Sequence, residues 1–186
     1  MSGRGRRPTA AYIDRDGTLM RDTGYVARSA EVELLPRAAD AVRLLNDEGV
    51  PVVIVTNQSG IGRGYFDESA FHAVQARLVQ LLELEGARIE ATYFCPHAPE
   101  DGCDCRKPGL ALYRKAALEL GLQSSGGLFA GDRVQDVLPA LELGGTGILV
   151  AGTDGTYDGP VPARVIRATD LWTGVSGLLL GAGNSP

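Results

Sequence analysis

The apolar residues of this chain alternate between short continuous runs and longer stretches with helical spacing. The short runs predict strands at residues 10–13, 52–55, 89–94, 127–130 and 147–150, with a sixth at 165–166. The stretches with helical spacing predict helices at residues 37–48, 67–86, 109–120, 134–143 and 171–180. Pro139 is expected to kink its helix or to mark a later start. Residues 19–36 and 56–64 are polar and predict loops.

Strands that alternate with helices indicate an α/β fold on a doubly wound, Rossmann-like parallel sheet. The chain has 186 residues, of which 44% are hydrophobic, and this is enough for one well-buried core but not for two comfortable domains. We therefore expect a single domain at residues 9–181. Residues 1–8 are expected to be a disordered basic tail, and residues 182–186 a frayed C-terminus.

Charge and hydropathy limit the classes of partner. The net charge of −5 argues against general affinity for nucleic acid, and the cluster of Arg4, Arg6 and Arg7 is expected to be a solvated tail, the alternative being a nucleic-acid-binding arm. No stretch reaches the ~20 apolar residues of a membrane span, and no apolar segment follows the N-terminal charges as in a secretory signal. We expect a cytoplasmic protein that binds no membrane.

Reactive side chains follow four of the predicted strands: Asp14 and Asp16, Thr56 and Ser59, the segment 95–107, and Asp132. Each cluster alone has an ordinary explanation, such as a solvated turn, a surface lysine at Lys107 or a helix N-cap at Asp132. In a doubly wound sheet, however, ligands bind outside the carboxyl ends of the strands. Four clusters at one sheet edge therefore predict an active site.

The side chains of this edge suit phosphoryl transfer. A carboxylate can form an aspartyl-phosphate, so Asp14 is the expected nucleophile, and Asp16 is placed to act as general acid and base. Asp14 and Asp132 could supply hard oxygen ligands to Mg²⁺. Lys107 could neutralise phosphoryl charge, and the hydroxyls of Thr56 and Ser59 could bind an anion beside glycine amides.

A second metal centre is predicted between residues 95 and 105. The chain's three cysteines and one of its two histidines cluster there, as Cys95, His97, Cys103 and Cys105. Three thiolates and an imidazole make the tetrahedral ligand set of a closed structural zinc site. Four protein ligands leave no open position, so this Zn²⁺ would shape the loop and take no part in catalysis. Reduced cysteines without metal are the alternative.

The motifs together resemble those of the haloacid dehalogenase superfamily of phosphotransferases. The resemblance is carried by the segments 14–18 (DRDGT) and 56–57 (TN), by Lys107, and by 131–132 (GD) with Asp136 beyond. It implies a Mg²⁺-dependent phosphatase. The carboxylates of Asp14 and Asp132 and the main-chain oxygen of Asp16 would hold the metal, while Thr56 and Lys107 would hold the phosphoryl group. Enzymes of this superfamily often carry a cap domain over the active site, and this chain has no room for one. The loops around the site would therefore determine which substrate is bound.

The zinc loop that leads into residues 105–108 (CRKP) is similar to one branch of this superfamily, which includes the D-glycero-D-manno-heptose 1,7-bisphosphate phosphatases and the histidinol-phosphate phosphatases. Residues 56–61 with 63–64 match the second motif of that branch. The resemblance implies a set of substrate-binding residues: Asp22, Thr23, Gly24, Tyr25, Asn57, Gln58, Ser59, Arg106 and Arg133.

The leading hypothesis is removal of the C7 phosphate from a heptose 1,7-bisphosphate, a step toward heptose for lipopolysaccharide or surface glycans. Arg106 beside Lys107 could hold a distal phosphate or sugar hydroxyls, which favours a bisphosphate. The alternative is a histidinol-phosphate phosphatase, in which Glu100, Asp101 or Asp104 would face the ammonium group. Two other classes fit the sequence less well. A non-catalytic protein of this fold should lack one of the essential aspartates, whereas Asp14, Asp16 and Asp132 are all present. A polynucleotide phosphatase should carry a basic surface, whereas this chain has a negative net charge. A monomer is expected.

Overall fold

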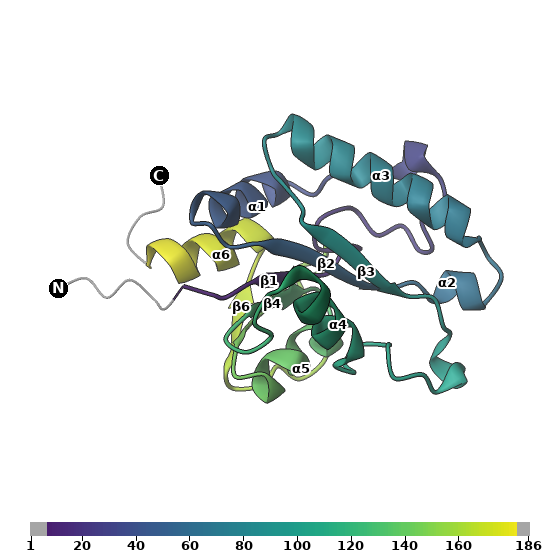
Figure 1. The fold of residues 1–186 in the computed structure, drawn as a ribbon. Coiled ribbons are helices and arrows are strands. Elements are labelled where there is room, and N and C mark those ends of the chain that lie inside the picture. Colours follow the sequence, from purple (N-terminus) through teal and green to yellow (C-terminus); the bar gives the residue numbers. More distant parts are fainter. Residues whose placement is uncertain (1–6, 182–186) are drawn as a thin grey trace.

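The computed structural model describes residues 7–181, which form a parallel sheet between two layers of helices (Figure 1). The strands and longer helices, in chain order, are β1 (Ala11–Ile13), α1 (Ala38–Asp47), β2 (Val52–Asn57), α2 (Ser59–Gly62), α3 (Glu68–Leu84), β3 (Ala91–Cys95), α4 (Ala111–Leu120), β4 (Leu128–Gly131), α5 (Val134–Glu142), β5 (Thr146–Val150), β6 (Val165–Ala168) and α6 (Leu171–Leu180). Short 3₁₀ turns lie at Ser29–Glu31 and Pro99–Asp101.

The sheet confirms the predicted fold class. Its six strands are parallel and lie in the order β3-β2-β1-β4-β5-β6. The first strand is central, with Ala11 beside Val52 of β2 on one side and Leu128 of β4 on the other. The chain therefore winds outward from β1 in both directions, and the point where the direction reverses lies at the ends of β1 and β4.

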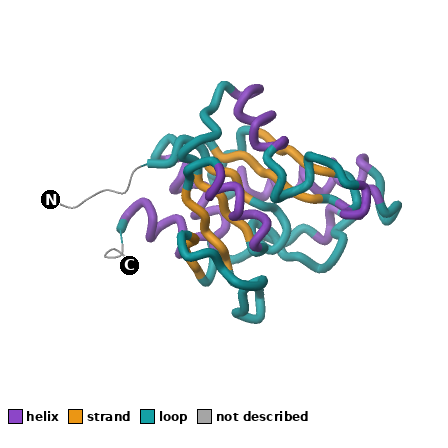
Figure 2. The backbone as a smooth tube through the Cα atoms, turned by 90° about the horizontal axis from the view of Figure 1, so that it is seen from below, coloured by secondary structure: helices purple, strands orange, loops and turns teal. Residues whose placement is uncertain are grey.

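Alternation along β1 explains why helices cover both faces of the sheet. Ala11 and Ile13 belong to the core formed with α1, α3 and α6, while Tyr12 faces the opposite layer. There Tyr12 packs edge-on against Tyr113 of α4 and stacks on Phe129 of β4, with ring centroids 5.4 and 5.1 Å away. The view from below shows the strands (orange) lying between helices (purple) (Figure 2). Every side chain of β1 is buried, as expected for a central parallel strand.

Helix ends follow the expected capping chemistry. The side chain of Asp67 accepts a hydrogen bond from the Ala70 N–H at the start of α3 (2.8 Å), and Asp170 does the same for Thr173 at the start of α6 (2.7 Å). Gly121 ends α4 in the left-handed conformation, with a φ of 64°. These local signals account for the good agreement of the predicted and observed helix bounds.

The differences lie in the connections. Residues 59–62 form the one-turn helix α2 where a loop was predicted, because a turn so short and glycine-rich shows no periodicity. The helix α4 begins at Ala111 and not at Gly109, because residues 106–109 make a turn in which the Gly109 N–H bonds the Arg106 carbonyl. Pro139 does not delay α5, which runs through it from Val134.

The predictions for the two ends fall largely outside the described residues. Residues 1–6 of the predicted basic tail, and all of residues 182–186, lie beyond the part that the structure describes. Of the remainder, Arg7 is exposed and Pro8 is buried. Within residues 7–181, no helix is both long and apolar enough to cross a membrane.

Candidate active site

A cavity of about 370 Å³ opens at the carboxyl ends of β1 and β2. The side chains predicted to carry the chemistry, Asp14, Asp16, Thr56 and Lys107, all line it. The remaining lining residues come mainly from the loops after β1, β2 and β4 and from the segment before α4. They are Arg15, Asp22, Gly24, Tyr25, Val26, Asn57, Gln58, Ser59, Gly60, Arg63, Pro99, Arg106, Arg133, Gln135 and Asp136.

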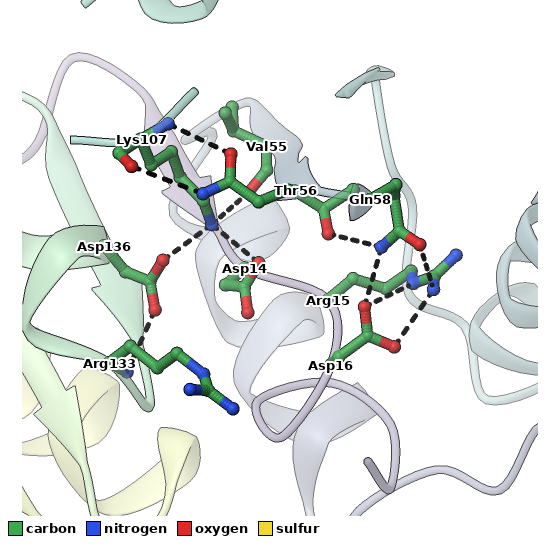
Figure 3. Close-up of polar contacts among 10 residues, drawn as sticks. Asp14, Arg15, Asp16, Val55, Thr56, Gln58, Lys107, Arg133 and Asp136 are labelled. Atoms are coloured by element: carbon green, nitrogen blue, oxygen red, sulfur yellow. Dashed lines mark hydrogen bonds and ion pairs between the residues drawn. The ribbon is translucent and has the colours of Figure 1, made fainter. Parts of the chain in front are cut away.

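A buried lysine lies between two carboxylates at the base of this cavity (Figure 3). The Nζ of Lys107 is 2.7 Å from Asp14 Oδ1 and 2.7 Å from Asp136 Oδ1. It also donates a hydrogen bond to the carbonyl of Val55 in β2 (2.8 Å). Only 2% of the Lys107 side chain is exposed, so its position is fixed by these three partners. An ammonium group held in this way can interact with an anion that reaches Asp14.

Burial and crowding of negative charge shift the ionisation of this cluster. Burial raises the pKa of Asp14 to about 8, against the attraction of Lys107, and the neighbouring carboxylates add to the rise. Burial also raises the pKa of Asp132 to about 7, with help from Asp136. Burial alone would lower the pKa of Lys107, but the charges of Asp136 and Asp14 outweigh it and the pKa of the ammonium rises. The lysine therefore stays charged at neutral pH.

The carboxylates of Asp14, Asp132 and Asp136 offer oxygens that all lie within 4.8 Å of one another. Asp132 Oδ1 is buried and has no hydrogen-bond partner among the described residues. Two glycines allow this crowding. A side chain at Gly17, which has a φ of 74°, would collide with the Asp132 carboxylate, and one at Gly131 would collide with Asp136. An unpaired buried oxygen within a set of hard ligands fits a divalent cation such as Mg²⁺.

Asp16 is oriented differently from Asp14. Its carboxylate accepts hydrogen bonds from the neighbouring Arg15, through Nε (3.1 Å) and Nη2 (3.0 Å), and from Gln58 Nε2 (2.8 Å). Gln58 also donates to the hydroxyl of Thr56 (2.8 Å). The predicted substrate-binding side chain Gln58 is 5% exposed, and its amide is engaged within the protein.

Asn57 lies at the end of β2, and its amide bonds both main-chain groups of Lys107. Its Oδ1 accepts from the Lys107 N–H (3.0 Å), and its Nδ2 donates to the Lys107 carbonyl (3.3 Å). Contact of Asn57 with substrate stays a prediction, and what the structure shows is that Asn57 joins β2 to the segment that carries Lys107. Both the backbone and the ammonium group of Lys107 are therefore held by neighbouring residues.

The rim of the cavity carries charged and aromatic groups. Arg106 and Arg133 both line it, and Arg106 Nη1 is buried without a hydrogen-bond partner among residues 7–181. Arg133 lies 3.8 Å from Asp22 across the opening. Tyr25 is 51% exposed and packs edge-on against Tyr65, with ring centroids 4.7 Å apart. Of the predicted substrate-binding residues, Thr23 is exposed and is not among the lining residues.

The four predicted zinc ligands lie together at the end of β3 and on the loop from there to α4. Ligand atoms of Cys95, His97, Cys103 and Cys105 are all within 4.8 Å of one another. The Cys105 sulfur is 3.0 Å from that of Cys95 and 3.2 Å from His97 Nδ1. Burial raises the pKa of the Cys95 thiol. At Cys103 desolvation also acts to raise the pKa, but hydrogen bonds from the other two thiols and from backbone N–H groups together lower it to about 7. The donor set fits a tetrahedral Zn²⁺ two residues before Lys107.

Among the residues to which sequence reasoning gave no role, Asp136 and Arg15 pair with predicted catalytic side chains. Asp136 pairs with Lys107, and its four-residue spacing from Asp132, at the start of a helix, was an available signal. Arg15 pairs with Asp16 and is 1% exposed. An arginine at a strand end is ordinarily exposed to solvent, so the sequence around Arg15 did not predict that its side chain is buried.

Comparisons with known proteins find related phosphatases. A family model described as HAD-hydrolase-like matches residues 104–167. A D-glycero-beta-D-manno-heptose-1,7-bisphosphate 7-phosphatase of Pseudomonas aeruginosa is 35% identical over 170 residues, which cover 90% of this chain and 96% of the relative. The Pseudomonas putida enzyme of the same name is 35% identical over 162 residues, covering 86% and 93%.

A solved structure extends the agreement to the fold. The D,D-heptose 1.7-bisphosphate phosphatase from B. bronchiseptica, complexed with magnesium and phosphate, superposes with a TM-score of 0.83 at 32% identity, covering 93% of this chain and 99% of that one.

Proposed function

Since this chain belongs to the family of the D-glycero-D-manno-heptose-1,7-bisphosphate 7-phosphatases, within the haloacid-dehalogenase-like hydrolases, we propose that it removes the C7 phosphate of such a heptose bisphosphate. The observation that carries the proposal is the buried arrangement of Asp14, Lys107 and Asp136 at the base of a cavity whose rim bears arginines. It combines a nucleophile, a fixed cation and a place for a second anion.

The first half of the reaction assigns a role to each group at the base. The carboxylate of Asp14 attacks phosphorus, a bond forms between its oxygen and phosphorus, and the bond from phosphorus to the C7 oxygen breaks. Asp16 gives its proton to the departing oxygen. Lys107 stays charged and offsets the negative charge of the phosphoryl oxygens, with the Thr56 hydroxyl beside them.

The second half restores the protein. Asp16, now ionised, takes a proton from water, and the resulting hydroxide attacks the phosphorus of the aspartyl-phosphate. Inorganic phosphate leaves, Asp14 regains its carboxylate, and Asp16 is again protonated. Asp16 lines the cavity beside Asp14 and can serve both halves.

Two metals belong to the proposal. Asp14, Asp132 and the main-chain oxygen of Asp16 would hold Mg²⁺, which when bound supplies positive charge to the phosphoryl group. Cys95, His97, Cys103 and Cys105 would hold a structural Zn²⁺ that fixes the loop leading to Lys107. We further propose a single domain, since the described strands form one sheet, and a cytoplasmic monomer.

The charges around the cavity favour a bisphosphate over histidinol phosphate. Arg63, Arg106 and Arg133 all line the cavity and could hold a second phosphate. None of the acidic residues considered for an ammonium group, Glu100, Asp101 and Asp104, is among the residues that line the cavity. Glu100 pairs with Arg63 (3.2 Å), and Asp101 accepts from the Ala98 N–H (2.8 Å).

A substrate panel tests the proposal directly. Release of phosphate is measured with both anomers of the heptose 1,7-bisphosphate, with fructose 1,6-bisphosphate and with histidinol phosphate, each with Mg²⁺. We expect the highest kcat/KM for a heptose bisphosphate. A large preference for histidinol phosphate would overturn the substrate assignment but would leave the phosphatase chemistry standing.

A further inference from the structure

Arg15 has an environment that is unusual for a charged side chain. It is the largest of the fully buried side chains, with 1% of its surface exposed. Its guanidinium carbon lies 5.3 Å from the centre of the Phe71 ring, which is itself buried. A buried guanidinium needs a compensating charge. The structure supplies one carboxylate, that of Asp16, which is 20% exposed and lines the active-site cavity.

Arg15 and Asp16 make a bidentate contact, called here the Arg15 fork. Arg15 Nε donates to one oxygen of Asp16 (3.1 Å) and Nη2 donates to the other (3.0 Å), so the carboxylate is held in position and in rotation. Gln58 closes a ring with them, because its Oε1 accepts from Arg15 Nη2 (3.1 Å) and its Nε2 donates to Asp16 Oδ2 (2.8 Å) (Figure 3). The ring joins the end of β1 to the segment after β2.

We infer that Arg15 is the positioning residue of the reaction, holding the Asp16 carboxylate in the orientation from which it transfers its proton. The inference rests on the proposed function, since it presumes that Asp16 is the acid and base. Proton transfer requires the donor within hydrogen-bond reach of the leaving oxygen, and a displacement of about 1 Å can cost on the order of 10²-fold in rate. Arg15 holds Asp16 at both carboxylate oxygens, and Gln58 adds a second hydrogen bond to Oδ2.

The inference predicts a dependence on the leaving group. A simple alkyl or sugar phosphate releases a strongly basic oxygen that needs a proton. By contrast, p-nitrophenyl phosphate releases an oxygen that can depart as an anion. Loss of the Arg15 fork should therefore slow the first substrate and spare the second. A residue that merely maintained the fold, or that contacted the phosphate, would affect both substrates alike.

The experiment measures formation of the aspartyl-phosphate in single turnovers with enzyme in excess, using p-nitrophenyl phosphate and a heptose bisphosphate. We expect Arg15→Met to slow sugar release by about 10²-fold and p-nitrophenolate release by less than about threefold. Arg15→Lys keeps the charge but not the fork, and it should fall between wild type and Arg15→Met on the sugar. Arg43→Met, which removes an exposed ion pair on α1, is the control and should change neither rate.

A double-mutant cycle completes the test. In the Asp16→Asn background, Arg15→Met should cost nothing further on either substrate, because its effect passes through Asp16. Equal losses on both substrates, a further loss in the Asp16→Asn background, or no loss on the sugar would each overturn the inference. If Arg15→Met fails to fold, Arg15→Lys alone decides by the same comparison. Asp16→Asn with unchanged sugar turnover would instead count against the proposed function.

Discussion

The amide of Asn57 provides a test of how tightly the Lys107 segment must be held. Asn57→Ala removes the two hydrogen bonds to the main chain of Lys107. Each such bond contributes about 0.5–1.5 kcal/mol, so the free energy of unfolding should fall by about 1–3 kcal/mol. Without them the Lys107 backbone can shift relative to Asp14, and we expect kcat/KM to fall about 10–100-fold.

The chain contains a matched control in Asn46. This side chain makes the same pair of bonds with one residue outside the site, donating to the Arg88 carbonyl (3.1 Å) and accepting from the Arg88 N–H (2.7 Å). Asn46 and Asn57 are both half-buried. Asn46→Ala should therefore cost a similar free energy of unfolding and leave turnover unchanged.

Chemical denaturation and steady-state kinetics on the two variants separate stability from positioning. A 10–100-fold loss in kcat/KM corresponds to about 1.4–2.8 kcal/mol of transition-state stabilisation, well above the error of the assay. If both variants lose activity in proportion to their stability, or if Asn57→Ala turns over normally, Asn57 does not position Lys107.

Three further outcomes are expected. Asp14→Asn should abolish phosphatase activity, while circular dichroism should show that the variant still folds. Turnover at the wild-type rate in this variant would refute the assignment of Asp14 as nucleophile. Because the folded, magnesium-free protein holds protons on Asp14 (pKa about 8) and Asp132 (pKa about 7) that the unfolded chain releases near pH 4, its stability should fall as pH rises from about 4 to about 8. Added Mg²⁺ should raise the melting temperature more at about pH 8 than at about pH 5, and a pH-independent gain would contradict this sign. Metal analysis of purified protein should give about one zinc per chain, and Cys103→Ser should lower both the zinc content and the melting temperature; a metal-free protein of full activity would exclude the zinc site.

The fold was predictable from sequence because local pattern and global architecture agree. Continuous apolar runs predicted the buried strands, and helical spacing predicted helix bounds close to those observed, such as residues 67–86 for α3 (Glu68–Leu84). The one-turn helix after β2 was missed, since a segment with two glycines in four residues has neither periodicity nor helix propensity. Its conformation is set by packing: a side chain at Gly60 would collide with Phe66 and Tyr25.

The side chains that meet at the site were predictable as a group, whereas their partners were not. The carboxyl ends of parallel strands share one edge, and this brought Asp14, Thr56 and Lys107 together. The direction in which Asn57 and Gln58 point depends on hydrogen bonds to residues about 40 to 50 positions away, such as Asp16 and Lys107. No pattern within either segment encodes those bonds.

The central place of β1 has a consequence for the order in which a growing chain can complete its catalytic cluster. β1 pairs first with β2, 41 residues further on (Ala11 with Val52), and then with β4, 117 residues further on (Ala11 with Leu128). During synthesis Asp14 emerges before its carboxylate neighbours Asp132 and Asp136, which follow it by 118 and 122 residues (132 − 14 and 136 − 14). Closing so long a loop before the contacts form is entropically unfavourable. The catalytic cluster can therefore be completed only after the start of α5 has been made, more than 100 residues after its nucleophile.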